Sequence, residues 1–409
     1  MHYTAGPDLA AGGDVTHRAR SNIDATASCT SRKVATHTRA SFLDQWASST
    51  ERPGRALRSR RRSTRRFGGG AKASRRNTVC TVEPPEIEIV PVDGEGSFWD
   101  DRRGLLACLR ETPPRVPAYL GYDALGSELF EAITELPGYY PTRVEHRLLQ
   151  RHAEQIADLI GYERIAELGS GSAKKTRLLL AACVERRPTC YLPIDVSREM
   201  LVASARELTT ELPGLRVQGL WGRYEAGLGW LRDGTPEPVT VALLGSNLGN
   251  TTPEERAALL AEIAATLRPG DRFLVSADLQ KPAAVLEACY NDPPDRSAFA
   301  RFRLNHLSHL NRLFDADFIL EYFYPRAHYD AASTAVQGHL YATEDQTVAL
   351  RELDLDLILR RGDSLNVGFS YKFHRPEFVA AVAARGFDLG AQWIDGVWQY
   401  GIFLFVRSA

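Results

Sequence analysis

From about residue 85 onward, short apolar runs alternate with segments whose apolar residues recur every three to four positions. Short apolar runs are typical of buried strands, and the three-to-four spacing is typical of helices with one buried face. The predicted strands cover residues 164–168, 190–194, 239–244 and 273–277. The predicted helices between them cover residues 175–183, 198–212 and 253–267. This alternation predicts an α/β fold in which a parallel sheet carries helices on both faces.

Residues 281–375 interrupt the alternation, and we interpret them as an insertion late in the sheet domain. The insertion is predicted to contain a helix over 297–313 and antiparallel strands over 337–341, 354–359 and 366–372. A helix over 376–385 and strands near 392–393 and over 401–406 then close the chain. Ahead of the sheet, we predict a strand over 86–92 and helices over 100–112, 126–135 and 143–159.

Residues 1–82 differ from the rest of the chain in charge and in pattern. They hold 16 Lys and Arg against 5 Asp and Glu, whereas residues 83–409 hold 34 against 46. They lack a periodic apolar face, so they cannot bury enough apolar area to offset their chain entropy, and we predict a disordered basic leader. An over-extended translation start fits this interpretation. An organelle-targeting peptide and a nucleic-acid-binding arm are the alternatives.

Composition excludes several classes of protein. No apolar run approaches 18 residues, which argues against a membrane span. The six cysteines lie far apart without a C-x-x-C pair, which argues against a disulfide scaffold and a zinc knuckle. We therefore expect a soluble protein of the cytoplasm, or of an organelle if the leader is a targeting segment.

A glycine-rich turn follows the first predicted strand of the sheet. It contains Gly169 and Gly171, and Lys174 stands where a dinucleotide-binding fingerprint needs its third glycine. Glu167, just before this turn, is typical of class I S-adenosylmethionine (SAM) methyltransferases. Asp195 ends the next strand, where a carboxylate can accept hydrogen bonds from both ribose hydroxyls. The alternative is a structural loop followed by a surface aspartate.

Beyond this turn, the chain resembles a family of SAM-dependent Nα-methyltransferases. The best-known member trimethylates histidine to hercynine in ergothioneine biosynthesis, and fungal relatives act on tryptophan-derived substrates. The matching stretches are residues 122–130, 133–143 with the unusual string L-P-x-Y-Y-P-T-R, 165–177, 244–250 and 370–373. The resemblance covers about residues 85–409, and it implies a class I Rossmann-like SAM methyltransferase sheet with an inserted α+β substrate-binding domain.

The charge, the residue patterns and the resemblance together predict domain limits. They are a leader over 1–82, an N-terminal helical part of the substrate domain over 83–150, a SAM-binding domain over 151–280, an inserted substrate-binding domain over 281–375, and a C-terminal part over 376–409 that completes the SAM-binding domain.

Site residues are carried over position by position, with SAM as the cofactor and no metal. Catalytic positions, which align the amine and hold the substrate's α-amino and carboxylate groups, are Tyr122, Asn250 and Tyr290. Substrate-binding positions are Tyr139, Gly245, Gly338, Gly368 and Ser370. Cofactor-binding positions are Glu167, Gly169, Gly171, Lys175, Asp195, Arg223 and Tyr224. Methyl transfer from a sulfonium needs alignment and a neutral amine, so no general base is required.

Two positions depart from the histidine-specific pattern. Gly368 stands where those enzymes have a glutamate that binds the imidazole N–H, and Gly338 aligns with a pocket-wall methionine. A charge-assisted hydrogen bond of about 1.5–3 kcal/mol is lost with the carboxylate. We therefore expect an aromatic substrate larger than histidine, such as tryptophan or tyrosine. The alternatives are histidine itself, or β-bulge glycines with His339 or Asp363 taking over the polar role.

Other residues receive simpler interpretations. His306 and His309 lie three residues apart on a predicted helix, but without a third ligand nearby we expect core or exposed histidines and no metal. Trp393 and Trp398 are expected in the core or an interface, and Glu128 and Glu131 on an exposed helix face.

Two other function classes compete with this one. One is a nucleic-acid or protein methyltransferase, which the acidic balance of residues 83–409 disfavours. The other is a SAM-binding regulator, which the intact Tyr122, Asn250 and Tyr290 disfavour. We expect a monomer that takes a small amino-acid substrate, with no nucleic-acid or membrane partner.

Overall fold

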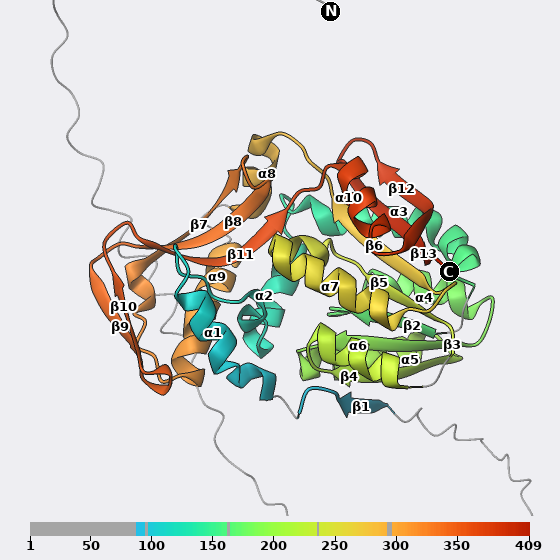
Figure 1. Cartoon of the computed structure of the whole chain (residues 1–409), viewed down its shortest axis with the longest axis horizontal. Coiled ribbons are helices and arrows are strands. Elements are labelled where there is room, and N and C mark those ends of the chain that lie inside the picture. The colour runs from blue at the N-terminus through green and yellow to red at the C-terminus, as the bar shows by residue number, and fades with distance from the viewer. Residues whose placement is uncertain (1–86, 95–96, 162–163, 235–236, 293–296) are drawn as a thin grey trace, which may run out of the picture. The chain divides into compact units, whose positions relative to one another are not determined.

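The computed structural model of the chain describes residues 87–94, 97–161, 164–234, 237–292 and 297–409 (Figure 1). The predicted disordered leader over 1–82 lies outside these residues. No helix in the described part of the chain is both long enough and apolar enough to cross a membrane.

An eight-stranded mixed sheet forms the larger part of the described fold. Its six leading strands pair in parallel, and the last two strands are antiparallel to their neighbours. The strands in sheet order are β1 (Glu88–Pro91), β4 (Leu215–Trp221), β3 (Thr189–Asp195), β2 (Arg164–Leu168), β5 (Val239–Leu243), β6 (Arg272–Asp278), β13 (Tyr400–Arg407) and β12 (Phe387–Asp395). The chain order reverses between β2 and β5, and ligands of open α/β sheets bind at such a point.

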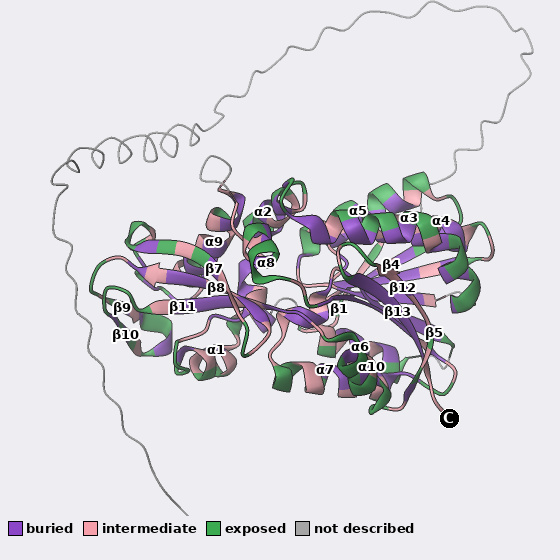
Figure 2. Cartoon of the chain, turned by 90° about the horizontal axis from the view of Figure 1, so that it is seen from above, coloured by how far each residue is buried: buried purple, intermediate pink, exposed green. Residues whose placement is uncertain are grey.

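Helices cover both faces of this sheet, as the sequence predicted (Figure 2). One face carries α3 (Tyr140–Ile160), α4 (Thr176–Val184) and α5 (Arg198–Glu211), which share one apolar core with the strands. The other face carries α6 (Tyr224–Asp233), α7 (Pro253–Thr266) and α10 (Arg375–Ala383), which share a second core. A capping box between Thr252 and Glu255 starts α7 and satisfies two of its free amide groups.

A second group of elements lies beside the carboxyl ends of the parallel strands. Its strands form a three-stranded antiparallel sheet in the order β11-β8-β7 and a separate β9–β10 hairpin. They are β7 (Phe323–Asp330), β8 (Ala335–Ala342), β9 (Gln346–Leu350), β10 (Leu355–Leu359) and β11 (Ser364–Tyr371). The helices are α1 (Arg102–Leu109), α2 (Ala124–Thr134), α8 (Ala283–Tyr290) and α9 (Ala298–Leu313). The expected α/β fold with an α+β insertion is confirmed.

Several elements were not predicted from the sequence: β4, α6, β7, α8 and β9. Strand β4 illustrates the reason, because Gly219 breaks its apolar alternation. A Cβ at Gly219 would lie 2.6 Å from Ile89 of β1, so the glycine makes room for a neighbouring strand far away in sequence. A local pattern does not contain that information.

Helix α3 bears on the expected division of the chain. It runs without a break across residues 150–151 and packs on α4, β6, β12 and β13 of the large sheet. The division into a leader, a SAM-binding domain and a substrate domain stays a prediction.

Two interpretations of single residues can be compared with the structure. Trp393 is buried in the core, and Trp398 stacks on Tyr140 with ring centroids 4.8 Å apart. Glu128 is exposed as expected, but the interpretation of Glu131 was wrong. Glu131 accepts hydrogen bonds from Ser172 (2.9 Å) and Lys174 (2.8 Å), because its face of α2 lies against the glycine-rich turn.

Candidate active site

Two adjoining cavities lie among the loops that follow β2, β3 and β5. The larger has a volume of about 460 Å³ and the smaller about 100 Å³. They share part of their walls, including Tyr122, Phe130, Asn250 and Gly368. The two spaces therefore meet at residues that the sequence had marked as catalytic or substrate-binding.

The glycine-rich turn and the end of β3 form one wall of the larger cavity. Gly169 and Gly171 have φ values of +70° and +51°, a conformation that glycine adopts without strain. A Cβ at Gly171 would meet no atom within 4 Å, so the turn opens onto free space. The carboxylate of Asp195 accepts hydrogen bonds from the Gly171 and Ser197 amides, both at 2.9 Å. Burial raises the pKa of Asp195, and these amide hydrogen bonds oppose that shift.

Another wall of the larger cavity carries an ion-pair cluster. Arg223 pairs with Asp93 at 2.7 Å and with Asp101 at 3.4 Å, and Tyr224 begins α6 beside it. The Tyr224 hydroxyl covers Gly169, where a Cβ would lie 2.4 Å from it. Sequence reasoning found Arg223 and Tyr224 but missed Asp101, which caps α1 and reaches this wall from 122 residues away.

Two predicted cofactor residues, Glu167 and Lys175, line neither cavity. Glu167 is buried and accepts hydrogen bonds from Thr176 (2.7 Å) and from Tyr191, and burial raises its pKa to about 7. Lys175 pairs with the buried Glu145, whose carboxylate also accepts a hydrogen bond from the Gly245 amide at 2.7 Å. In this structure both residues support the loops after β2 and β5, and their predicted roles at the cofactor stay predictions.

The smaller cavity is lined by all the residues predicted as catalytic or substrate-binding. They come from segments far apart in the sequence, namely Tyr122, Tyr139, Gly245, Asn250, Tyr290, Gly338, Gly368 and Ser370. Phenylalanines 130, 299 and 302 add apolar walls. Tyr122 packs edge-on against Phe130 and Phe302, with centroids 5.5 and 5.2 Å apart. The roles of the eight residues stay predictions, but the fold brings them together.

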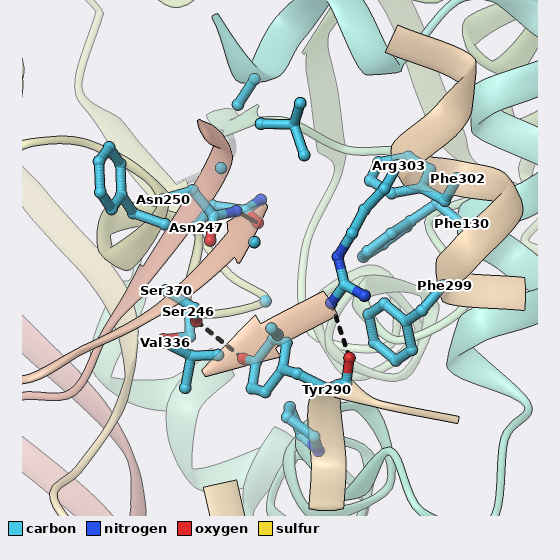
Figure 3. A pocket seen from close by; sticks show the side chains of 18 of the residues that line it. Phe130, Ser246, Asn247, Asn250, Tyr290, Phe299, Phe302, Arg303, Val336 and Ser370 are labelled. Carbon is cyan, nitrogen blue, oxygen red and sulfur yellow. Dashed lines mark hydrogen bonds between the residues drawn. The ribbon is translucent and has the colours of Figure 1, made fainter. Parts of the chain in front are cut away.

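A buried lysine organises the polar side of this cavity. The Nζ of Lys372 lies 2.9 Å from the Tyr290 hydroxyl, 2.7 Å from Ser370 Oγ and 2.9 Å from a carboxylate oxygen of Asp278. Tyr290 and Ser370 are themselves 2.7 Å apart, as a dashed line in Figure 3 marks. Both hydroxyls accept a hydrogen bond from the ammonium, and one of them donates to the other. One hydroxyl hydrogen is left free to serve the cavity as a donor.

Lys372 was missed as a functional residue, although it stands in a stretch that carried the resemblance. Its distance of two residues from Ser370 could have indicated a role in the site. Residues two apart on a strand lie on the same face, and Ser370 was already a predicted substrate-binding residue.

Arg303 of α9 is a second polar residue that sequence reasoning missed. Its side chain is only 6% exposed, lines the smaller cavity and lies over the Phe299 ring at 5.1 Å (Figure 3). Its Nη2 donates to the Tyr290 carbonyl at 2.7 Å. The residue stands on the same helix face as the buried Phe299, Leu307 and Leu310. A charged residue on the apolar face of a predicted helix could have indicated a functional role for Arg303.

Gly338 and Gly368 are partners across β8 and β11. A shift of register between Asn366 and Gly368 marks a β-bulge, and Gly368 has a φ of +153°. The bulge alternative is therefore confirmed for Gly368. The other half of that alternative stays a prediction, and His339 and Asp363 line neither of these two cavities. His339 bonds to Ser364 and Gln337, and Asp363 accepts from the Arg360 amide.

The two histidines of α9 are buried, as one of the interpretations held. His309 bonds to the Leu120 carbonyl at 2.8 Å. His306 lines the smaller cavity, and burial lowers its pKa to about 4, so it is neutral near pH 7. Within the described ranges, no group of three or more His, Cys, Asp or Glu side chains is placed to hold a metal ion.

The fold and the larger cavity together define a class of enzyme. A parallel sheet with a reversed strand at β13, a glycine-rich turn at the point of chain reversal and a carboxylate after the next strand are the features of class I SAM-dependent methyltransferases. The residues present fit that cofactor, because the turn is open and Asp195 is aimed at the same space.

The chain belongs to the histidine-specific, SAM-dependent methyltransferase family, whose model matches residues 101–407. It is 35% identical over 305 residues to the histidine N-alpha-methyltransferase of Mycobacterium tuberculosis, covering 74% of this chain and 94% of that protein. It is 28% identical over 315 residues to the 4-dimethylallyltryptophan N-methyltransferase of Epichloe festucae var. lolii, covering 70% and 89%. Among solved structures, it matches the magnesium protoporphyrin IX methyltransferase of Synechocystis PCC 6803 at 13% identity and a TM-score of 0.39, covering 72% and 98%. The protein is a SAM-dependent N-methyltransferase.

Proposed function

We propose that the enzyme methylates the α-amino group of a free amino acid whose aromatic side chain is larger than that of histidine. The observation that carries this proposal is the wall of the smaller cavity. Four phenylalanines and Tyr139 line it, and Gly368 leaves open the place where the resemblance implies a side-chain carboxylate. Aromatic walls favour an aromatic ligand through offset or edge-on contacts. Methylation of histidine itself is the alternative, supported by the 35% identity to a histidine enzyme.

The two cavities suggest separate tasks for this chain's residues. Gly169, Gly171 and Asp195 would hold SAM, with Arg223 and Tyr224 beside it. When bound, SAM supplies an electrophilic methyl group. Tyr122 and Asn250 line both cavities, so they are suited to align an amine between the two spaces.

The polar groups of the smaller cavity suit a zwitterionic substrate. Tyr290 and Ser370 offer one hydroxyl donor, fixed by Lys372, and Asn250 offers an amide. Donors of this kind can bind an α-carboxylate, and the amine must lose its proton before it accepts the methyl group. Because the lowered pKa of His306 keeps its imidazole neutral, it does not add positive charge near the amine. Its Nε2 has no hydrogen-bond partner among the described residues.

The acidic balance of residues 83–409 supports a small substrate over a nucleic acid. We further propose that the enzyme acts as a monomer in the cytoplasm.

The test is turnover of SAM to S-adenosylhomocysteine (SAH) by the full chain with each of the twenty amino acids and several indole derivatives. Mass spectrometry identifies the products. We expect an aromatic amino acid larger than histidine to gain methyl groups with kcat/KM at least tenfold above that of histidine. Preferred trimethylation of histidine would establish the alternative. Binding of SAM without methylation of any free amino acid would contradict the proposed function.

A further inference from the structure

Arg303 occupies the space beside Gly338, where the resemblance implies a larger side chain in the histidine-specific enzymes. A Cβ at Gly338 would lie 3.2 Å from Nε and 3.8 Å from Cδ of Arg303. The loss of a larger side chain on β8 therefore does not simply enlarge the cavity. It makes room for a guanidinium that reaches across from α9.

The guanidinium faces the smaller cavity and makes one hydrogen bond to the described protein. Among the described residues, its acceptor is the Tyr290 carbonyl, and no ion pair joins it to a described carboxylate. Asp292 lies farther away and accepts a hydrogen bond from the Phe299 amide. Burial lowers the pKa of Arg303 to about 10, so the group still carries its charge at neutral pH. The Phe299 ring offsets only part of the cost of burying that charge.

A guanidinium has five N–H donors in a planar array, and it accepts no hydrogen bond. A ligand oxygen that accepts from the remaining donors would complete its hydrogen bonding. An apolar ring edge or an N–H donor in the same place would leave the buried donors unsatisfied, which is unfavourable. The side of the cavity near Gly338 and Gly368 thus discriminates by chemistry as well as by size.

We propose that Arg303 is a specificity-determining residue that selects amino acids whose side chain ends in an oxygen acceptor. The phenol of tyrosine is the reference case. This inference rests on the proposed function, because it requires a free amino acid in the smaller cavity. It narrows the expected aromatic class, since the indole N–H of tryptophan is a donor and cannot satisfy a guanidinium.

An alternative role for Arg303 is to bind the substrate's α-carboxylate. Two observations favour the side-chain role. Arg303 lies beside Gly338 of β8, which the resemblance assigns to the wall around the substrate's side chain. The hydroxyl groups of Tyr290 and Ser370 are hydrogen-bonded to each other, and Lys372 donates to Ser370. This pair is available to donate a hydrogen bond to the substrate's α-carboxylate.

The experiment compares tyrosine with phenylalanine, which differ by one hydroxyl oxygen. We expect wild type to prefer tyrosine in kcat/KM by on the order of 10–100-fold, as for a hydrogen bond to a charged group. Arg303→Met keeps length without charge, and it should reduce this ratio to near one, mainly by slowing tyrosine. The matched control is Arg301→Met, an exposed arginine of the same helix, which should leave the ratio unchanged.

Each outcome has a distinct meaning. An equal loss for tyrosine and phenylalanine in Arg303→Met would overturn the inference and assign the arginine to the α-carboxylate. A wild-type ratio near one would overturn it directly. SAH binding measured by calorimetry reports whether Arg303→Met is folded, and if it is not, Arg303→Lys takes its place and should show a smaller ratio than wild type. If no amino acid is methylated although SAH binds, the proposed function fails instead.

Discussion

The two cavities of this enzyme are built in different ways. The larger is formed by the loops that follow parallel strands of the sheet together with residues between 101 and 131, and its polar groups include the Asp195 carboxylate and the Arg223 guanidinium. The smaller is formed by side chains from α8, α9, β8 and β11 packed against the same loops, with aromatic walls, a buried lysine and a buried arginine. One set of contacts follows from the sheet, whereas the other depends on how the inserted elements meet it.

This difference indicates which changes the protein can accommodate. A change in the insertion, such as glycine at 338 with arginine at 303, alters the smaller cavity without touching the turn at Gly169 and Gly171. We therefore expect changes at positions 303 and 338 to alter the choice of amino acid more than the binding of SAM.

The largest expected effect is at Lys372, where stability and the smaller cavity depend on one group. Lys372→Met removes two hydrogen bonds, to Tyr290 and Ser370, and one ion-pair partner of the buried Asp278. We expect unfolding free energy to fall by about 3–5 kcal/mol, the cost of breaking a buried ion pair. We also expect the KM for the amino acid to rise more than that for SAM. Denaturant titration and steady-state kinetics measure both effects.

Lys281→Met is the matched control, because Lys281 also pairs with Asp278 but does not contact Tyr290 or Ser370. It should reduce stability and leave the amino-acid KM near that of wild type. If both variants raised the amino-acid KM equally, Lys372 would have a structural role alone.

The same contrast separates what the sequence could predict from what it could not. Each feature of the glycine-rich turn lies within a few residues of a strand end, so the local pattern located Gly169, Gly171 and Asp195. The Arg303–Gly338 contact joins residues 35 positions apart on different elements, and nothing local to either residue indicates it. The resemblance located eight residues of the smaller cavity, because it transfers known site positions from the family to this sequence. It could not indicate Arg303, which is not one of those positions.

The fold follows a similar rule. Short strands that are mostly apolar and almost wholly buried, such as β2 and β5, were predicted close to their observed limits. Strand β7 was missed because its residues alternate between buried, half-buried and exposed, as only one side of it meets the core.

A smaller effect is expected at Asp195, which tests the larger cavity. Asp195→Ala should weaken SAH binding about 100-fold, since two hydrogen bonds to a charged group are worth about 3 kcal/mol. Asp271→Ala is the matched control. The buried carboxylate of Asp271 likewise accepts hydrogen bonds from two backbone amides, those of Val239 and Arg268, but Asp271 lines neither cavity. Calorimetric titration with SAH measures both. Equal weakening in the two variants would mean that Asp195 acts only by holding its loop.

The smallest effect is expected at Glu167, which lies beside the larger cavity without lining it. Burial raises its pKa to about 7, so the folded protein keeps the proton to higher pH than the unfolded chain. Its contribution to stability is complete below the unfolded pKa of about 4.5 and is lost as the pH rises through 7, by about 1–3 kcal/mol. Glu167→Gln cannot ionise, so its melting temperature should fall less than that of wild type between pH 5 and 8, whereas exposed Glu128→Gln should follow wild type.

SAH affinity should stay within threefold of wild type, because Glu167 bonds to Thr176 and Tyr191 rather than facing the cavity. A tenfold loss of SAH affinity in Glu167→Gln, with the pH dependence of melting unchanged, would instead return this carboxylate to the cofactor-binding residues.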